Sequence, residues 1–272
     1  MIISSPVNIS GAANFTIARH SSATENKRLS KLAARASRRF AWHWADESIA
    51  GHPWRIATAT DPDGMLLDAC RRQDAGETHV IDPFWATVWR AAAGLDHFLD
   101  RYDLRDKRVL EVGCGTGRGG LAAALRGAQV TLTDGVSDPL LLVQLTVASL
   151  ANRCQVRRLR FGVDSIADEP PFEMILGSDV TYLRVLWPEL EKSLRQHLQP
   201  QGQVLLSDPF RFIANEFRDW IQARGWHYVE HSIDVAAPNY DHAGKQAVNA
   251  QAGQEPTANA YPIRVMCLTL PA

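Results

Sequence analysis

Short apolar runs alternate along the chain with segments in which leucine or alanine recurs every three or four residues. The runs have the length of buried strands, and the recurring spacing is that of helices with one apolar face. Five strands separated by helices are therefore predicted, at residues 109–112, 130–133, 155–161, 172–179 and 204–206. Two later stretches, 226–235 and 261–270, predict a terminal hairpin. The segment 236–260 between them is rich in Ala, Asn, Gln and Gly, which indicates an exposed loop.

Single strands that alternate with helices favour a parallel, doubly wound sheet. The terminal hairpin makes the last strand antiparallel. We therefore predict an α/β fold over residues 83–272, with a doubly wound, mostly parallel seven-stranded sheet of Rossmann-like architecture. A helix from Asp82 to about Arg101 is expected to pack on this sheet ahead of its first strand, with Trp89 beside its buried stripe.

The residues ahead of this domain differ in composition. Residues 1–40 carry seven Lys or Arg and one acid, with frequent serine, which predicts a basic, disordered tail. The same composition fits an organelle transit peptide if the source is eukaryotic, or a segment that contacts an acidic substrate. Residues 41–82 are rich in aromatic side chains and predict a small hairpin or cover over the main sheet.

A glycine-rich turn follows the first predicted strand of the domain. The strand ends at Glu111, and the turn that joins it to a helix is Gly113-Cys114-Gly115-Thr116-Gly117. Glycine has no Cβ, so the backbone of such a turn can approach a ligand closely, and the helix behind it presents free N–H groups. The next strand ends in Asp134, twenty-one residues after Gly113, where a carboxylate can accept hydrogen bonds from ribose hydroxyls. The pattern predicts a nucleotide-like cofactor.

Two cofactors suit this layout. A dinucleotide requires G-x-G-x-x-G directly after the strand, and counted from Gly113 the sixth position is Arg118. The dinucleotide pattern fits only from Gly115, which leaves two extra residues after the strand. The alternative pattern, E-x-G-x-G-x-G, fits from Glu111 to Gly117 without adjustment.

Further polar and aromatic residues lie where the other strands end. Phe161 is placed to lie against a base and Asp164 to accept from an amino group, at the end of the third strand. Ser178, Asp179 and Tyr182 lie at or just after the end of the fourth strand. Because ligands bind at the carboxyl ends of the strands in open α/β sheets, these residues are expected to share one site with the glycine turn.

Composition excludes several classes of protein. The net charge is −1 and no apolar run reaches the length of a membrane span, so nucleic acid and membrane partners are not expected. The nine histidines show no ligand spacing, and we assign no metal site. The scattered cysteines are typical of reduced thiols, which favours a cytoplasmic location, or a mitochondrial one if the basic segment is a transit peptide. They are Cys70, Cys114, Cys154 and Cys267.

The motif from Glu111 to Gly117 resembles the first motif of class I S-adenosylmethionine-dependent methyltransferases. Residues from about 83 to 211 further resemble a protein-lysine methyltransferase group that is marked by Asp-x-x-Tyr/Phe after the fourth strand, here Asp179-Val180-Thr181-Tyr182. Two other stretches are similar to the electron-transfer-flavoprotein β-subunit lysine methyltransferases and their bacterial relatives. These are Pro83-Phe84-Trp85-Ala86-x-x-Trp89 and Ser207-Asp208-Pro209-x-Arg211.

The resemblance implies a fold, a cofactor and residue roles. It implies the methyltransferase sheet, S-adenosylmethionine as cofactor and a protein lysine as methyl acceptor. Asp179 would hold the target amine and Tyr182 would help to wall the transfer site. The residues implied to bind the cofactor are Trp89, Glu111, Gly113, Cys114, Gly115, Thr116, Gly117, Asp134, Phe161, Asp164 and Ser178.

Other functions use the same core. A small-molecule N- or O-methyltransferase would use the aromatic segment 40–89 as a lid, and a non-catalytic module would bind a partner through an intact cofactor fold. A nucleic-acid methyltransferase usually carries Asn/Asp-Pro-Pro-Tyr/Phe where this chain has Asp179 to Tyr182. A nicotinamide-dependent oxidoreductase corresponds to the other glycine register. The sequence makes no prediction of oligomeric state.

Overall fold

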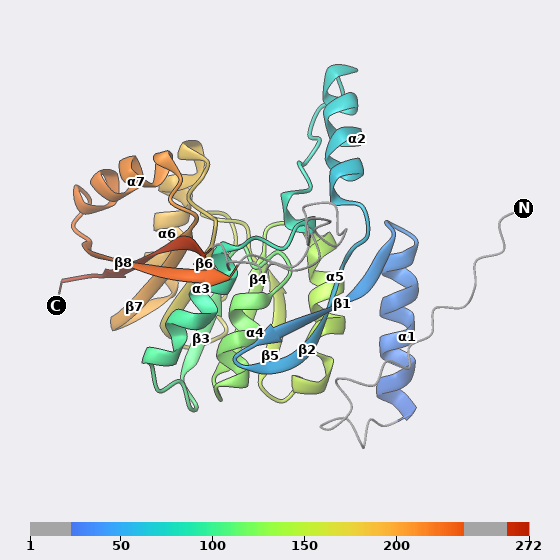
Figure 1. Ribbon diagram of the computed structural model, residues 1–272, viewed down its shortest axis with the longest axis horizontal. Helices are drawn as coiled ribbons and strands as arrows, with labels where there is room; N and C mark the ends of the chain where they lie inside the picture. The colour runs from blue at the N-terminus through green and yellow to red at the C-terminus, as the bar shows by residue number, and fades with distance from the viewer. Residues whose placement is uncertain (1–22, 237–259, 272) are drawn as a thin grey trace, which may run out of the picture.

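A sheet of seven strands organises the structure (Figure 1). The computed structural model describes residues 23–236 and 260–271. Across the sheet the strands follow the order β5 (Cys154–Arg158), β4 (Gln129–Asp134), β3 (Arg108–Glu111), β6 (Phe172–Ser178), β7 (Leu198–Asp208), β9 (Ala260–Thr269) and β8 (His227–Ala236). The predicted loop across 236–260 lies, apart from its two end residues, outside the described residues.

The last strand, β9, lies between β7 and β8 and runs antiparallel to both. The pairs from β5 to β7 are all parallel. The predicted α/β fold, a doubly wound and mostly parallel seven-stranded sheet with an antiparallel last strand, is confirmed. Because parallel strands end at the same edge, the residues that follow β3, β4, β5 and β6 meet at one edge of the sheet.

Helices cover both faces of the sheet through apolar stripes. On one face, Leu95, Leu121 and Val143 enter the core from α3, α4 and α5. On the other face, Leu190 and Phe217 do so from α6 and α7. The α-helices of the described chain are α1 (Ala23–Ser37), α2 (Pro62–Asp74), α3 (Ala91–Phe98), α4 (Arg118–Leu125), α5 (Ser137–Thr146), α6 (Trp187–His197) and α7 (Phe212–Gln222).

The N-terminal part of the described chain packs on α5. A two-stranded hairpin, β1 (Trp42–Ile49) and β2 (His52–Ala59), lies where the sequence predicts one. Thr146 of α5 ties it down, because its hydroxyl accepts a hydrogen bond from the backbone N–H of Ala57 at 3.0 Å. Ala33 and Ala36 of α1 are buried in a cluster with leucines of α5. The prediction of a disordered tail is therefore wrong for residues 23–37, while residues 1–22 lie outside the described residues.

The helix predicted from Asp82 begins later, at Ala91. A short 3₁₀ turn at Phe84–Ala86 replaces its first part. Trp89 follows this turn in a loop, where its indole N–H donates to the carbonyl of Phe84 at 2.8 Å. The prediction that Trp89 lies on the helix is therefore wrong. The loop instead carries it toward the edge at which the strands end.

Among residues 23–236 and 260–271, no helix has the length and apolar character needed to cross a bilayer.

Candidate functional site

The glycine turn between β3 and α4 adopts the backbone that its sequence predicts. Gly113, Gly115 and Gly117 have φ angles of 60°, 50° and 77°, in the left-handed region that favours glycine. The backbone N–H of Cys114 donates to the carbonyl of Thr133 at 2.8 Å, which ties the turn to the end of β4. The side chains of Cys114 and Thr116 are buried, and burial raises the pKa of the Cys114 thiol well above its usual value. These two residues can therefore meet a ligand mainly through their backbone.

Asp134, which is predicted to bind ribose hydroxyls, also shapes the turn. One of its carboxylate oxygens accepts from the backbone N–H of Gly115 at 3.0 Å, and the other accepts from Val136 at 2.9 Å. Burial raises the pKa of Asp134 although these N–H groups favour its charged form. Each oxygen keeps a second lone pair, so the predicted contact with ribose hydroxyls remains available.

Glu111 differs from its predicted role. Its carboxylate is only 1% exposed and lies beneath the first turn of α4, so close that a Cβ on Gly119 or Gly120 would fall 2.5 or 2.7 Å from its oxygens. A group buried to this degree makes no direct contact with a cofactor, and the prediction of Glu111 as a cofactor ligand is corrected to that of a buried support for α4. Burial raises the pKa of Glu111 to about 8.

Replacing Glu111 with glutamine is expected to flatten the pH dependence of stability. The folded protein holds this proton to about pH 8 and the unfolded chain loses it near 4.5, so the free energy of unfolding falls as the pH rises between these values. At pH 8.5 the free energy of unfolding of E111Q should therefore exceed that of the wild type by on the order of a few kcal/mol. At pH 5 this difference should be smaller. Denaturant unfolding at both pH values measures this.

Glu173 provides the control for that measurement. Lys107 lowers the pKa of Glu173, so its carboxyl group is ionised in both the folded and the unfolded state above pH 5. E173Q should leave the pH slope between 5 and 8.5 unchanged. An E111Q variant with the same slope as the wild type would contradict the assignment of a protonated Glu111.

Phe161 and Asp164, which follow β5, have different surroundings. The ring of Phe161 lies near the turn, with its Cζ 3.7 Å from the position of a Cβ on Gly113. Asp164 is held by Arg160, whose guanidinium donates to both carboxylate oxygens at 2.8 and 3.0 Å. Phe161 is therefore well placed beside the glycine turn. If Asp164 binds adenine as predicted, its carboxylate must accept hydrogen bonds from adenine and from Arg160 at the same time.

The Asp-x-x-Tyr motif, which begins at Asp179, lies beside the glycine turn. The next residue, Val180, places its Cγ1 2.9 Å from the position of a Cβ on Gly113. Asp179 has a left-handed φ of 56°, and its side chain is 5% exposed. Both of its oxygens accept hydrogen bonds from Arg211, at 2.7 Å each. The structure thus brings the Asp-x-x-Tyr motif and the glycine turn together, and it adds an arginine to the motif.

Aromatic rings surround this ion pair. The ring of Phe84 contacts Tyr182 edge-on at 5.8 Å between centroids, and Trp89 at 6.5 Å. The guanidinium of Arg211 lies over the Trp89 ring, 5.6 Å from its centroid. Burial, and then the charge of Asp179, raise the pKa of the Tyr182 hydroxyl, so this group stays protonated. Ser178 lies at the base of the site, where its hydroxyl accepts from that of Ser207 at 3.2 Å.

A model of the lysine methyltransferase family matches residues 78–217, which is more than half of the chain. The chain belongs to the lysine methyltransferase family. The match begins just before the 3₁₀ turn of Phe84 and ends within α7, so it contains every predicted site residue. The resemblance inferred from the motifs is therefore confirmed.

Curated proteins of similar sequence are named as lysine methyltransferases. EEF1A lysine methyltransferase 3 of Mus musculus is 37% identical over 133 residues, which cover 46% of this chain and 56% of that protein. Protein N-lysine methyltransferase METTL21A of Danio rerio is 35% identical over 142 residues, which cover 48% of this chain and 63% of that protein. The chain thus spans about three-fifths of the length of these relatives.

Solved structures share the fold at low sequence identity. A precorrin-6y C5,15-methyltransferase from Geobacter metallireducens superposes with a TM-score of 0.50 at 11% identity, over 71% of this chain and 96% of that one. The glycopeptide N-methyltransferase MtfA, in complex with S-adenosylhomocysteine, gives 0.50 at 14% identity, over 68% of this chain and 91% of that one. These likenesses support the Rossmann-like methyltransferase fold.

Three residues of this family member's site had no role assigned from the sequence. They are Phe84, Trp85 and Arg211, although the stretches that contain them carried part of the resemblance. The carbonyl oxygen of Trp85 lies 3.6 Å from the position of a Cβ on Gly115, so the 3₁₀ turn lies over the glycine turn. Phe84 faces Tyr182 on one side, while Trp85 contacts Phe40 on the other at 5.2 Å between centroids. The spacing of residues within one strand or helix does not predict contacts of this kind, because they join different elements.

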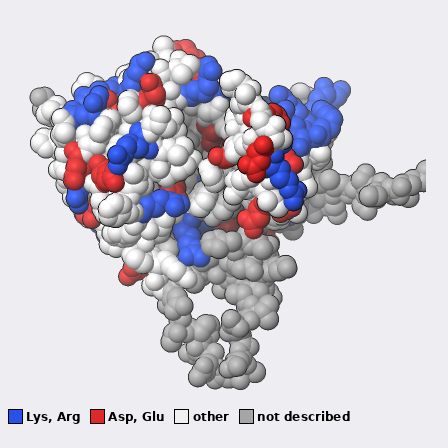
Figure 2. Space-filling view, turned by 90° about the horizontal axis from the view of Figure 1, so that it is seen from above, with Lys and Arg blue, Asp and Glu red and all other residues white. Residues whose placement is uncertain are grey.

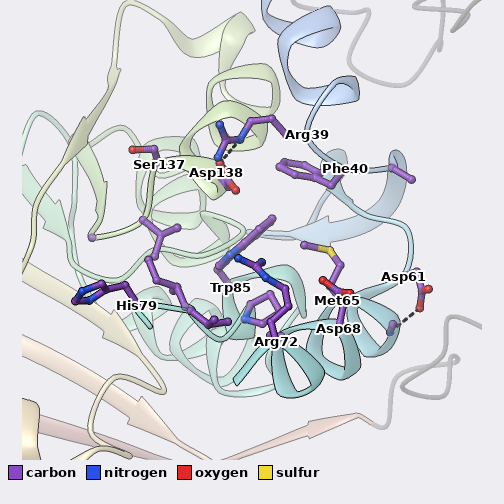
Figure 3. Close-up of a pocket in the computed structure, with 18 of the residues that line it drawn as sticks. Arg39, Phe40, Asp61, Met65, Asp68, Arg72, His79, Trp85, Ser137 and Asp138 are labelled. Carbon is purple, nitrogen blue, oxygen red and sulfur yellow. Dashed lines mark hydrogen bonds and ion pairs between the residues drawn. The ribbon is translucent and has the colours of Figure 1, made fainter. Parts of the chain in front are cut away.

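A pocket of about 720 Å³ lies on the Trp85 side of this turn. Residues of α2, among them Met65, Asp68 and Arg72, line one wall, and the start of α5 lines another (Figure 3). An ion pair between Arg39 and Asp138 joins the end of the α1 region to α5 at its rim. Seen from the side on which α2 stands, the surface is hollowed near its centre and acidic side chains lie in the hollow (Figure 2).

Within the described chain, no group of three or more His, Cys, Asp or Glu side chains is arranged to hold a metal ion. The site is built from a glycine turn, carboxylates, aromatic rings and two arginine–aspartate pairs. This set suits a cofactor with hydroxyl groups and positive charge. It also suits an acceptor that has to be aimed at the cofactor.

Proposed function

We propose that this protein transfers a methyl group from S-adenosylmethionine to the side-chain amine of a lysine in another protein. The observation that carries the proposal is the closeness of the two motifs, in which Cγ1 of Val180 in the Asp-x-x-Tyr motif lies 2.9 Å from the position of a Cβ on Gly113 of the cofactor motif. An acceptor held at Asp179 is thereby next to a cofactor held at the glycine turn. The names of the curated relatives, which identify them as protein lysine methyltransferases, support the choice of acceptor.

The residues at the turn fit S-adenosylmethionine. Asp134 can accept from ribose hydroxyls, and the rings of Phe161 and Trp89 offer apolar walls. A dinucleotide fits poorly, because the position at which its motif requires a third glycine is Arg118, which is buried and ion-paired with Glu47 of the hairpin. When bound, S-adenosylmethionine supplies a methyl group on a sulfonium, already activated for displacement by a lone pair.

The protein's own contribution is orientation and the exclusion of water. Asp179 can accept a hydrogen bond from the acceptor amine and so aim its lone pair, which is where most of the rate gain in such a transfer arises. Tyr182 and Phe84 form an aromatic wall beside it. Because this wall is apolar, it keeps water from the transfer site.

The surface around the site favours a macromolecular acceptor over a small molecule. Two segments next to Asp179 and Arg211 present large apolar side chains to solvent, and an ion pair between Arg184 and Glu216 joins them. Clustered exposed apolar residues of this kind typically mark protein interaction sites. We call this set the apolar rim, and its members are Leu183, Val185, Leu186, Phe210 and Phe212.

An aspartate at position 185 is expected to weaken binding of the protein acceptor. Val185 is 78% exposed, so V185D should leave folding and S-adenosylmethionine affinity unchanged while it raises the KM for the acceptor by about tenfold, through loss of apolar contact and added charge. Val229, 55% exposed on the edge strand β8, is the matched control, and V229D should behave as the wild type. Equal KM values for V185D and V229D would argue against the apolar rim.

The direct test of the proposed function is transfer of labelled methyl from S-adenosylmethionine into a lysate of the source organism. Label is expected in bands that protease removes and nuclease does not, and it should be recovered as methyl-lysine after acid hydrolysis. Label in small molecules alone would move the assignment to a metabolite methyltransferase. Binding of S-adenosylmethionine without any transfer would favour the non-catalytic module.

A further inference from the structure

Arg211 is the partner of the residue that we expect to hold the acceptor amine. Its guanidinium donates to both oxygens of Asp179 at 2.7 Å, a paired geometry that fixes the carboxylate as well as neutralising it. The Asp179 side chain is 5% exposed and the Arg211 side chain 36% exposed, so solvent screens this pair only in part. The flat face of Trp89 supports the guanidinium from one side.

The backbone at Arg211 is anchored in the core. Its N–H donates to a carboxylate oxygen of Asp208 at 2.7 Å, and Asp208 is fully buried at the end of β7. Arg264 of β9 lies 3.9 Å from the other oxygen of Asp208 and 3.5 Å from Glu230 of β8. The backbone of Arg211 is therefore tied to the end of β7, within reach of Asp179.

The charges around this pair are mostly negative. The carboxylates of Asp179 and Asp208 act on Arg211, while those of Asp82 and Asp134 act on the neighbouring Tyr182. Arg211 supplies positive charge in the middle of these groups. Without it, an amine that entered the site would meet an uncompensated, largely buried carboxylate.

We propose that Arg211 is a positioning residue that keeps the acceptor lysine in its neutral form by offsetting the charge of Asp179. This inference rests on the proposed lysine methylation. A carboxylate without a cationic partner stabilises the ammonium form of an adjacent lysine, and the ammonium form has no lone pair with which to attack the methyl group. Arg211 occupies one lone pair on each carboxylate oxygen of Asp179. The acceptor lysine loses its extra proton to water, and the second lone pairs can then accept an N–H of the neutral amine.

The test is the pH profile of methyl transfer in R211Q. Initial rates of label transfer from S-adenosylmethionine into soluble lysate protein are measured between pH 6.5 and 9.5. Loss of the guanidinium should shift the rising limb upward by about one to two pH units. R211Q should therefore be about 10- to 100-fold slower than the wild type at pH 7, and this gap should narrow as the pH rises.

Three controls separate this role from a structural one. Equilibrium dialysis with labelled S-adenosylmethionine and thermal unfolding show whether R211Q is folded and binds cofactor. R211K keeps the charge but loses the paired geometry, so its profile should lie between those of R211Q and the wild type. Arg105, which precedes β3, pairs with Asp103 through the same two donors and lies away from the site, so R105Q should keep the wild-type profile.

Each result bears on the inference. A uniform loss of rate at every pH, an unshifted R211Q profile, or an R211Q that is faster at pH 7 would overturn it while the proposed function stands. If R211Q does not fold, the R211K profile decides, and an unshifted R211K overturns the inference. If the wild type labels no protein at any pH, the proposed function fails and this inference fails with it.

Discussion

Replacing Asp179 with asparagine is expected to abolish methyl transfer almost completely while S-adenosylmethionine still binds. The amide offers the acceptor amine one accepting oxygen in place of two, and it leaves the guanidinium of Arg211 without its ionic partner. Removal of one well-placed polar group from a reaction site typically costs a factor of about 10² to 10³ in rate. We expect a loss at the upper end of this range, because both effects act together. Label transfer into lysate protein measures the rate.

Asparagine is the informative substitution at this position for a backbone reason. Asp179 has a φ of 56°, a left-handed conformation that asparagine adopts more readily than alanine. D179N should therefore keep the fold and bind S-adenosylmethionine within about threefold of the wild type. Asp168, an exposed acid paired with Arg157, provides the control, and D168N should be fully active. A D179N enzyme that transfers methyl at the normal rate would remove Asp179 from the mechanism.

Placing an alanine at Gly113 is expected to disrupt the cofactor site. Gly113 has a φ of 60°, which costs about 1–2 kcal/mol for a residue with a side chain. In addition, the new Cβ would lie 2.9 Å from Cγ1 of Val180, so the glycine turn and the Asp-x-x-Tyr motif would have to move apart. We expect affinity for S-adenosylmethionine to fall by at least tenfold, as measured by equilibrium dialysis, and stability to fall as well.

Gly76 isolates the backbone part of this effect. It has a φ of 80°, and a Cβ there would meet nothing within 4 Å. G76A should therefore lose a similar amount of stability from backbone strain and keep full cofactor affinity. If G113A and G76A bind S-adenosylmethionine equally well, the close contact between Gly113 and Val180 has no importance for the site.

The seven-stranded sheet could be predicted because its signals are local. Apolar runs such as Phe172–Ser178 are too short and too continuous for helices. Glycine at positions 113, 115 and 117 indicates a turn with left-handed φ angles. The Asp-x-x-Tyr motif was informative because it follows a strand, and all strands of one direction end at the same edge. That rule predicts that Asp179 and Gly113 lie at the same edge of the sheet.

The failures of prediction arose where local pattern and tertiary contact disagree. Residues 23–37 look like a charged, solvated tail, yet two alanines of α1 are buried against leucines of α5. The stretch before Ala91 has helical spacing, but a 3₁₀ turn and the hydrogen bond of Trp89 to Phe84 replace its first part. Glu111 belongs to a cofactor motif by spacing, and its burial beneath α4 is visible only once the helix is packed on the sheet.

The sequence by itself determined the strand and helix pattern, the glycine turn, and the position of the acids at strand ends. These depend on residue size, backbone freedom and the period of apolar positions, which are properties of neighbours along the chain. Only the tertiary structure decided that Arg211 pairs with Asp179, that Phe84 faces Tyr182, and that the 3₁₀ turn lies over the glycine turn. Those contacts join residues on different elements, so their geometry depends on how the elements pack and on which charges that packing removes from water.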